Sequence, residues 1–398
     1  MEKTNAQTII DRVLQASLVL FVASAPFSIT LTQTALGIAL LTWAGKMVLE
    51  RKWLVPRTPL DYFFLAYLIA EIISLIFSQN RLNSIIYFKR MLLIPIVYLI
   101  AGNVKTKRLA NLLILALITV TALMGIYGIY KYLTGVGGLE GRLKLFHHYM
   151  TSGGILMIIG LLNFSYTFSK APIRTKIATL VSGILIIIPL IFTFTRSSWI
   201  GFAAGLIIIG ILENRKLLAA LVAGLVAFIV LAPPALKDRT LSIFDVNHPH
   251  NVERTNMWKA GLKIMKDYPL TGVGDIDLGE IYQRYKSPQA KEKAGHLHNN
   301  FITIGATLGV PGLVVIVLLF LKILAVEYTI YRKVNQEDWF ARASCLGCLA
   351  AFVGFIINGL FEWTLGDAEL VMLIWFTIGF TLALEKQNLS SNDLKSFN

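Results

Sequence analysis

The chain has little charge and almost no cysteine. Charged residues make up 15% of its 398 residues, against about 25% in ordinary soluble domains. Together with a hydrophobic content of 56%, this excludes a disordered chain, a coiled coil and a water-soluble globule. The two cysteines, Cys345 and Cys348, cannot form a disulfide framework. Both lie in one apolar run, and we interpret them as packing surface rather than as a redox or metal motif.

Long apolar runs without charge recur along the whole chain. Each is close to the roughly 20 residues that a bilayer-spanning helix needs. The sequence therefore predicts an all-α polytopic membrane protein with about twelve transmembrane helices. The predicted spans are 12–28, 30–48, 60–78, 83–101, 109–130, 149–169, 177–194, 198–212, 217–233, 299–325, 340–360 and 368–385.

The basic residues indicate the orientation of these spans. The formal net charge is +14, from 37 Lys and Arg against 23 Asp and Glu. With the N-terminus in the cytoplasm, every short inner loop is basic, as the positive-inside rule requires. An even number of spans then returns the C-terminus to the cytoplasm, and the net charge reflects membrane orientation, not nucleic-acid binding. The inner loops hold Arg51, Lys52 and Arg57; Lys105, Lys107 and Arg108; Lys170, Arg174 and Lys176; Arg215 and Lys216; Arg332 and Lys333.

One long loop divides the predicted spans into two groups. Residues 1–233 hold the first nine transmembrane helices, and residues 299–385 hold the last three. The loop between them, 234–298, lies on the outer side in this orientation. We expect short helices in it, with 253–266 as the best helical stretch, and we expect function there because long ordered loops often carry it. The polar tail, 386–398, is predicted to be disordered and cytoplasmic.

Several charged residues lie near or within the predicted spans on the outer side. Arg196 interrupts the apolar stretch IPLIFTFTRSSWIGF, and Lys89 and Arg90 lie early in the fourth span. Ionisable residues are costly in a membrane and indicate functional sites by default. Because cations on this side oppose the positive-inside rule, we expect an anionic group there, with contact to lipid headgroups as the alternative. The outer side also holds Arg142, Lys144, His147 and His148, and the last outer turn carries Glu362, Asp367 and Glu369.

Two His-x-His pairs, His248/His250 and His296/His298, lie in the long loop. Histidine is a common zinc ligand, which makes the pairs candidate metal ligands. They are far apart in the sequence, and neither a His-Glu-x-x-His motif nor a cysteine-containing signature accompanies them. We therefore expect no catalytic metal and no cofactor.

The outer side thus combines arginines, a loop and a histidine that can accept a proton near pH 7. Such a set suits an anionic lipid whose leaving group is already activated, and a lipid pyrophosphate is the natural candidate. Arginines bind phosphate oxygens in bidentate fashion and neutralise the charge that grows as the bond breaks. The histidine would take the proton from an attacking hydroxyl.

Three short motifs carry a resemblance to a known family. His298 and Asn299 are followed by nine residues and then by Gly309-Val-Pro-Gly312. Arg196-Ser-Ser-Trp199 follows an apolar span, and the stretch from Arg254 to Trp258 is followed by Pro269 and a Gly272-Val-Gly274 turn. With these motifs and one large outer loop before the tenth span, the chain resembles the bacterial O-antigen ligase family. Its wider superfamily includes O-antigen polymerases and protein O-oligosaccharyltransferases.

The resemblance implies a fold, a reaction and a location. It implies a GT-C-type glycosyltransferase in the bacterial inner membrane, inverting and metal-independent, with its active site facing the periplasm. The donor would be a glycan on undecaprenyl pyrophosphate, and the acceptor a sugar hydroxyl of lipid A–core, with membrane lipids as the surroundings.

The resemblance also implies roles for particular residues. His298 would be the base or an acceptor-positioning group, and Arg196 and Arg254 would hold the pyrophosphate. Asn299 belongs to the histidine motif and is a candidate substrate contact, whereas His296 is outside the motif and receives no role. Weaker candidates for substrate contact are Lys89, Arg90, Arg142, Lys144 and His147.

Other functions remain open from the sequence. An O-antigen or exopolysaccharide polymerase would need the same donor site and differ in its acceptor, and a protein O-oligosaccharyltransferase is permitted by the same motif. A lipid-glycan transporter would also fit twelve spans. Transporters tend to place charges at the bilayer midplane and to show two related halves, whereas the charges here gather at the outer rim.

Overall fold

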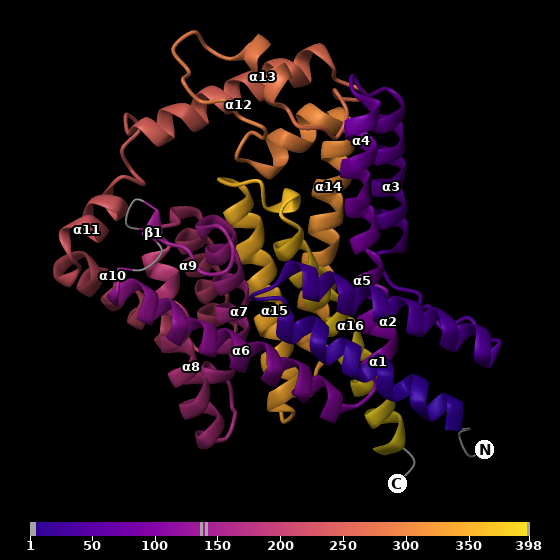
Figure 1. Cartoon of the computed structure of the whole chain (residues 1–398). Coiled ribbons are helices and arrows are strands. Elements are labelled where there is room, and N and C mark those ends of the chain that lie inside the picture. The colour runs from indigo at the N-terminus through magenta and orange to yellow at the C-terminus, as the bar shows by residue number, and fades with distance from the viewer. Residues whose placement is uncertain (1–4, 136–137, 140–141, 396–398) are drawn as a thin grey trace.

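The computed structural model describes residues 5–135, 138–139 and 142–395, and these are almost entirely helical (Figure 1). The first half contains α1 (Asn5–Ser24), α2 (Ile29–Glu50), α3 (Asp61–Ile76), α4 (Arg81–Phe88), η1 (Lys89–Leu93), α5 (Pro95–Asn103), α6 (Lys107–Leu133), β1 (Gly138–Leu139), β2 (Arg142–Leu143), α7 (Tyr149–Phe168) and α8 (Ile173–Phe192). The second half contains α9 (Arg196–Leu212), α10 (Lys216–Leu231), α11 (Pro234–Leu241), α12 (Pro249–Asp267), α13 (Gly279–Tyr285), α14 (Asn300–Lys333), α15 (Trp339–Gly359), η2 (Thr364–Gly366) and α16 (Ala368–Lys395). The strands β1 and β2 form a short antiparallel pair.

Among the described residues, eight helical segments are long and apolar enough to cross a membrane. They overlap eight of the predicted spans, and the other four predicted spans overlap the shorter or less apolar helices α2, α3, α9 and α10. The chain is therefore a helical, multi-pass membrane protein. Twelve crossings, with both termini in the cytoplasm, stay a prediction.

The fourth predicted span, 83–101, is not one regular helix. Helix α4 ends at Phe88, a 3-10 turn covers Lys89–Leu93, and α5 begins at Pro95. Proline has no amide hydrogen, so it suits the first turn of a helix and interrupts a longer one. The break places Lys89 and Arg90 at a bend of the backbone.

Helices α7, α9 and α15 pack closely because small residues lie at their contacts. A Cβ atom added to Gly201 of α9 would lie only 2.6 Å from the carbonyl oxygen of Gly354 in α15. Such close approach is typical of helix packing in membranes. Cys345 and Cys348 lie fully buried on the same helix, α15, as free thiols, in agreement with their interpretation as packing surface.

Helix α14 contains a sharp kink at Gly309, where φ is 71° and ψ is −177°. The amide of Val310 leaves the helical pattern and donates to the carbonyl of Pro269 at 2.8 Å. Proline is a usual cause of helix kinks, but the kink here lies at Gly309 and not at Pro311. Glycine is needed at 309 both for its left-handed backbone and because a side chain would collide with Leu270.

The long loop folds over one end of the bundle (Figure 1). The predicted helix 253–266 is present as α12, and α12 packs against α13 and α14. The loop has a small hydrophobic core of its own, which includes Met257, Ile264, Tyr282 and Leu297. This core holds the polar face of the loop in a fixed position over the bundle.

The C-terminal segment differs from the sequence prediction. We expected 386–398 to be disordered, but α16 extends to Lys395 and residues 396–398 lie outside the described residues. The side chain of Gln387 donates to the carbonyl of Val104 at 2.8 Å. A helix that is already formed extends at little cost, because each added residue contributes a further backbone hydrogen bond.

Candidate functional site

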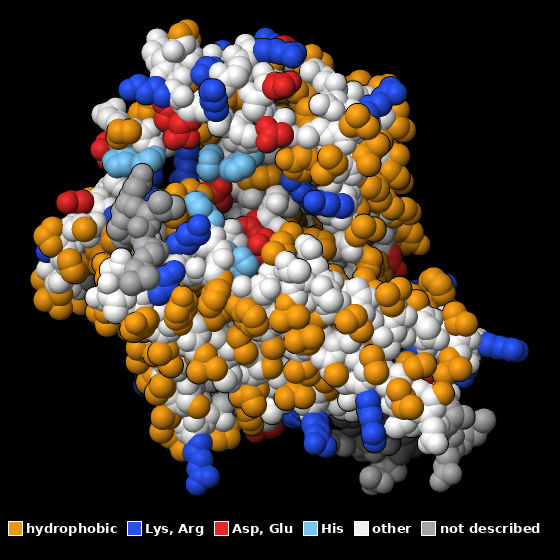
Figure 2. Space-filling model, viewed as in Figure 1, with side chains coloured by type: hydrophobic (Ala, Val, Ile, Leu, Met, Phe, Trp, Pro, Cys, Tyr) orange, Lys and Arg blue, Asp and Glu red, His pale blue; other side chains and the backbone are white. Residues whose placement is uncertain are grey.

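A polar hollow lies between the long loop and the bundle. In Figure 2, histidine, basic and acidic side chains gather there, above the hydrophobic surface of the bundle. Its centre is a cavity of about 180 Å³ that four arginines and His298 line together. The four arginines come from different elements: Arg142 from β2, Arg196 from α9, Arg239 from α11 and Arg254 from α12.

Arg196 is buried at the start of α9 and connects this helix to the loop. Its Nη1 donates to the carbonyl of Ser242 at 2.7 Å and to the Oγ of the same residue at 3.0 Å. Its Nη2 donates to Oδ1 of Asn251 at 2.8 Å. The guanidinium is thus held in place by neutral groups, and its positive charge is not cancelled by them.

A strained backbone residue holds two of the other arginines. Phe194 has a φ of 52°, which is uncommon for a residue with a large side chain. Its carbonyl oxygen accepts from Nη2 of Arg142 at 3.0 Å and from Nε of Arg239 at 3.1 Å. Arg142 also lies 3.6 Å from the ring centroid of Tyr149. The Phe194 carbonyl, in the turn between α8 and α9, therefore orients two guanidinium groups toward the same cavity.

The arginine cavity carries a net positive charge, because its four arginines outnumber the two acidic residues in its lining, Glu253 and Glu292. Burial, and then the charges of Arg142, Arg196 and Arg254, lower the pKa of Arg239 to about 10, so that it remains charged at pH 7. Within the described part of the chain, no carboxylate lies within 4.0 Å of the guanidinium nitrogens of Arg196 or Arg239. A cluster of arginines that outnumber the carboxylates around them is suited to an anionic ligand with several oxygens.

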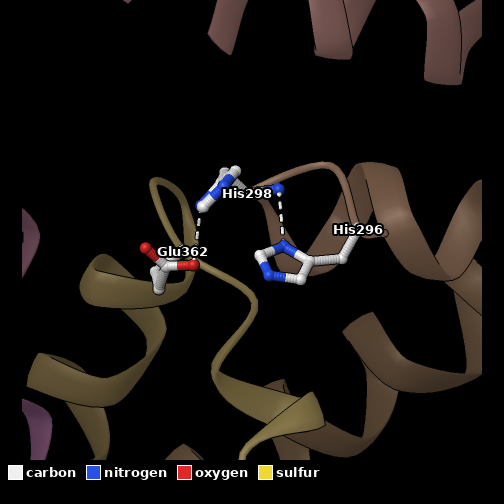
Figure 3. Close-up of side chains that lie close together, drawn as sticks. All are labelled: His296, His298 and Glu362. Carbon is white, nitrogen blue, oxygen red and sulfur yellow. Dashed lines mark hydrogen bonds and ion pairs between the residues drawn. The ribbon is translucent and has the colours of Figure 1, made fainter. Parts of the chain in front are cut away.

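His298 adjoins this cavity and is oriented by an acidic residue. Its Nδ1 lies 2.7 Å from Oε1 of Glu362 (Figure 3). Nη2 of Arg254 lies 3.6 Å from Oε2 of the same carboxylate. Burial raises the pKa of Glu362, but the hydrogen bond and charge of His298 and the charge of Arg254 lower it more, to about 2. Glu362 is thus an anion at neutral pH, which favours a proton on Nδ1 of His298 and leaves Nε2 to accept one.

His296 lies beside His298 without lining the arginine cavity. Its Nδ1 accepts a hydrogen bond from the backbone amide of His298 at 3.4 Å, and the ring centroids are 4.3 Å apart. Burial, and then the neighbouring His298, lower the pKa of His296 to about 4. The ring is therefore neutral at pH 7. His298 itself has a φ of 47°, so the backbone between the two histidines is a tight turn.

Asn299 has bonds within the protein that position the site. Its Oδ1 accepts from the amide of Ile302 at 3.0 Å and caps α14. Its Nδ2 donates to the carbonyl of Leu360 at 2.8 Å. These bonds connect the start of α14 to the turn that carries Glu362. A contact between Asn299 and substrate stays a prediction.

Lys89 and Arg90 lie outside the arginine cavity. Arg90 forms an ion pair of 3.0 Å with Asp275 of the loop and lies 5.4 Å from the ring centroid of Trp363. Burial raises the pKa of Asp275, and Arg90 opposes this rise. Lys89 is exposed. The position of Arg90 indicates that it fastens the loop to the bundle next to the Glu362 turn.

Lys144 and His147 also lie outside the cavity. Lys144 is exposed, and Nδ1 of His147 lies 3.3 Å from Oε1 of Glu369. The neighbouring Asp367 accepts from Oγ1 of Thr151 at 2.6 Å. Burial, and then the adjacent Glu369, raise the pKa of Asp367. This second polar cluster joins α7 to α16.

Several residues of the site received no role from the sequence, among them Glu362, Arg239 and His250. Glu362 was noted as an acid near an outer turn, but its pairing with His298 joins positions 64 residues apart. No sequence motif indicated a role for Arg239, because basic residues are common in polar loops. His250 also lines the cavity, and only its membership of a His-x-His pair was visible.

The fold and the site together define a membrane-embedded helical protein with an arginine-lined anion cavity beside a histidine–glutamate pair. Residues 181–317 match the family model described as O-antigen ligase. This match supports membership of the O-antigen ligase/polymerase superfamily, a glycosyltransferase-like family. The matched segment includes Arg196, Arg254 and His298. No curated protein matches the chain.

Proposed function

We propose that the protein is an O-antigen ligase. It transfers a glycan from undecaprenyl pyrophosphate to a sugar hydroxyl of lipid A–core, with inversion at the anomeric carbon and without a metal. The observation that carries this proposal is the single cavity in which four arginines meet His298. In this proposal the twelve spans form a GT-C-type fold in the bacterial inner membrane, and residues 234–298 cover the site on the periplasmic side.

The arginines supply the donor site. A pyrophosphate diester carries two negative charges, and guanidinium groups bind its oxygens through paired charge-assisted hydrogen bonds. Arg196 and Arg254 are the primary ligands, and Arg142 and Arg239 complete the wall. When the glycosidic bond breaks, the leaving pyrophosphate gains charge, and the fixed guanidinium groups stabilise that charge without reorganisation.

A second cavity suits the lipid end of the donor. It measures about 190 Å³ and is also lined by Arg196 and Arg254. Its other walls include the apolar side chains of Ile200, Ile243 and Val246. We place the first carbons of the polyprenyl chain there, because apolar groups favour an apolar wall and the shared arginines keep the pyrophosphate at the junction.

His298 and Glu362 supply the base. Nε2 of His298 takes the proton of the acceptor hydroxyl as its oxygen attacks the anomeric carbon of the donor sugar. The new carbon–oxygen bond forms on the face opposite the pyrophosphate, whose own bond to the sugar breaks. The imidazolium that results is stabilised by the anionic Glu362 on Nδ1, and it later releases its proton to water.

The proposal is tested by transfer in a purified system. The full-length protein in nanodiscs would receive undecaprenyl-pyrophosphate glycan and lipid A–core, with chelator and without nucleotide. Ligase activity appears as a shift in the mass of lipid A–core that His298→Ala abolishes. Lengthening of the lipid-linked glycan without that shift would instead identify a polymerase.

Two further assays test for a protein O-oligosaccharyltransferase and for a transporter. Glycan appearing on an added acceptor protein, and not on lipid A–core, would identify the oligosaccharyltransferase. Movement of the lipid-linked glycan across a vesicle membrane, with no covalent product, would identify the transporter. Any of these results would contradict the ligase proposal, whereas a chelator-resistant shift that requires His298 would support it.

A further inference from the structure

His296, His298 and Glu362 form a cluster with the donor set of a zinc site. Each residue offers one ligand atom, and the three atoms lie within 4.8 Å of one another. Figure 3 shows the two imidazole rings and the carboxylate side by side, at the meeting of the loop and the turn after α15. Two imidazole nitrogens and one carboxylate oxygen are a common ligand set for zinc.

The distance between His298 and Glu362 suits a small cation. Zinc binds histidine nitrogen and carboxylate oxygen at about 2.0–2.2 Å, so neighbouring ligand atoms lie roughly 3.3 Å apart in a tetrahedral site. Nδ1 of His298 and Oε1 of Glu362 are 2.7 Å apart and share a proton now. Exchanging that proton for a cation requires them to separate by only about half an ångström.

The second oxygen of Glu362 gives independent support. Oε2 is buried and has no hydrogen-bond partner among the described residues, and its neighbour Arg254 is 3.6 Å away. The free lone pairs of this oxygen leave the carboxylate able to take a further positive neighbour, such as a cation on Oε1. Asp277, whose carboxylate lies next to Gly295, adds negative charge near His296.

We propose that this cluster binds Zn²⁺ and that the bound ion inhibits the transferase. Zinc on Nδ1 of His298 moves the single proton of the neutral ring from Nδ1 to Nε2. Nε2 is the atom that must accept the hydroxyl proton of the acceptor, and once it is protonated it no longer can. The ion therefore blocks the base without entering the arginine cavity. The inhibition rests on the proposed function, whereas the binding of zinc does not.

The test measures binding and transfer separately on the full-length protein in nanodiscs. Chelator-treated protein is titrated with ZnCl₂ against a fluorescent zinc indicator, and transfer is measured across the same zinc concentrations. We expect one Zn²⁺ per chain and loss of transfer over the range in which zinc binds. MgCl₂ should have no effect at the same concentrations, because Mg²⁺ prefers oxygen ligands.

Two variants make the test specific. His296→Gln should keep transfer in chelator and weaken both zinc binding and zinc inhibition by at least about tenfold. The matched control is His248→Gln, which removes a histidine from the other His-x-His pair and should leave zinc inhibition unchanged. Zinc K-edge absorption spectra of the wild type should show two histidine ligands.

Each result supports or overturns the zinc site. Zinc inhibition that is equal in wild type and His296→Gln, or stimulation of transfer by zinc, would overturn the proposal. Absence of zinc binding would overturn it as well. If wild type binds zinc but shows no transfer in chelator, the ligase function fails while the metal site stands.

Discussion

The two His-x-His pairs of the loop share a sequence pattern and lie in different surroundings. His248 and His250 lie at the start of α12, where burial and the neighbouring arginines lower the pKa of both rings. His298 instead has the buried carboxylate of Glu362 on Nδ1. A histidine among cations stays neutral and passive, whereas a histidine on a carboxylate is oriented and can hold a proton. The acid, not the histidine motif, distinguishes the two pairs.

The largest effect should come from removing His298, and removing His250 from the other pair should have a much smaller one. His298→Ala should lower transfer by about 10²–10⁴-fold, the usual contribution of a general base. His250→Ala should lower it by less than about tenfold, because His250 lines the cavity without an acidic partner. Equal losses in the two variants, measured as initial rates of glycan transfer with comparable membrane insertion, would remove the distinction between the pairs.

The second-largest effect should come from removing the carboxylate of Glu362, which pairs with His298. Glu362→Gln should lower kcat by about 10–100-fold with little change in donor affinity, because the amide keeps a hydrogen bond and loses the charge that stabilises the imidazolium. Glu362→Asp, a shorter acid, should recover part of the rate. A Glu362→Gln enzyme with wild-type kcat would show that His298 does not depend on its partner.

A third effect concerns the cations around His250. Arg196→Ala or Arg254→Ala should weaken binding of the donor by about 10–100-fold, the value of one or two charge-assisted hydrogen bonds. Arg90→Ala, at an arginine already paired with Asp275, should change donor affinity much less and lower the thermal stability of the loop. Binding of undecaprenyl pyrophosphate to the nanodisc protein measures the difference. The assignment of the cavity fails if Arg90→Ala weakens binding most.

Much of the fold follows from the sequence, because the length and apolarity of a membrane helix are properties of one continuous segment. Each predicted span overlaps a helix, and α12 was visible from its own residues. The breaks were harder to predict. The kink of α14 falls at Gly309 and not at Pro311, because the loop carbonyl of Pro269 accepts a hydrogen bond from the amide of Val310.

The residues of the site could be predicted only where they belong to a short sequence motif. Arg196, Arg254 and His298 come from such motifs, and the structure brings them to one cavity. Arg239 and Glu362 could not be inferred, because their roles depend on contacts between segments distant in sequence. The left-handed Phe194 has no signature either, since such backbone is expected at glycine or asparagine. Lys89, Lys144 and His147 lie outside the cavity.

The smallest effect is a dependence of stability on pH that only one of the two pairs should show. The pKa of Glu362 is about 2 in the folded protein, below the usual 4.5. A lowered carboxyl pKa contributes stability above about pH 4.5, and this contribution is lost as the pH falls towards 2. The melting temperature of wild type should therefore fall between about pH 5 and pH 3 more steeply than that of Glu362→Gln. His250→Gln should follow the wild-type curve, because it leaves the carboxylate and its partners in place. Parallel curves for wild type and Glu362→Gln would mean that the acid is not stabilised by His298 and Arg254, and the contrast between the two histidine pairs would lose its physical basis.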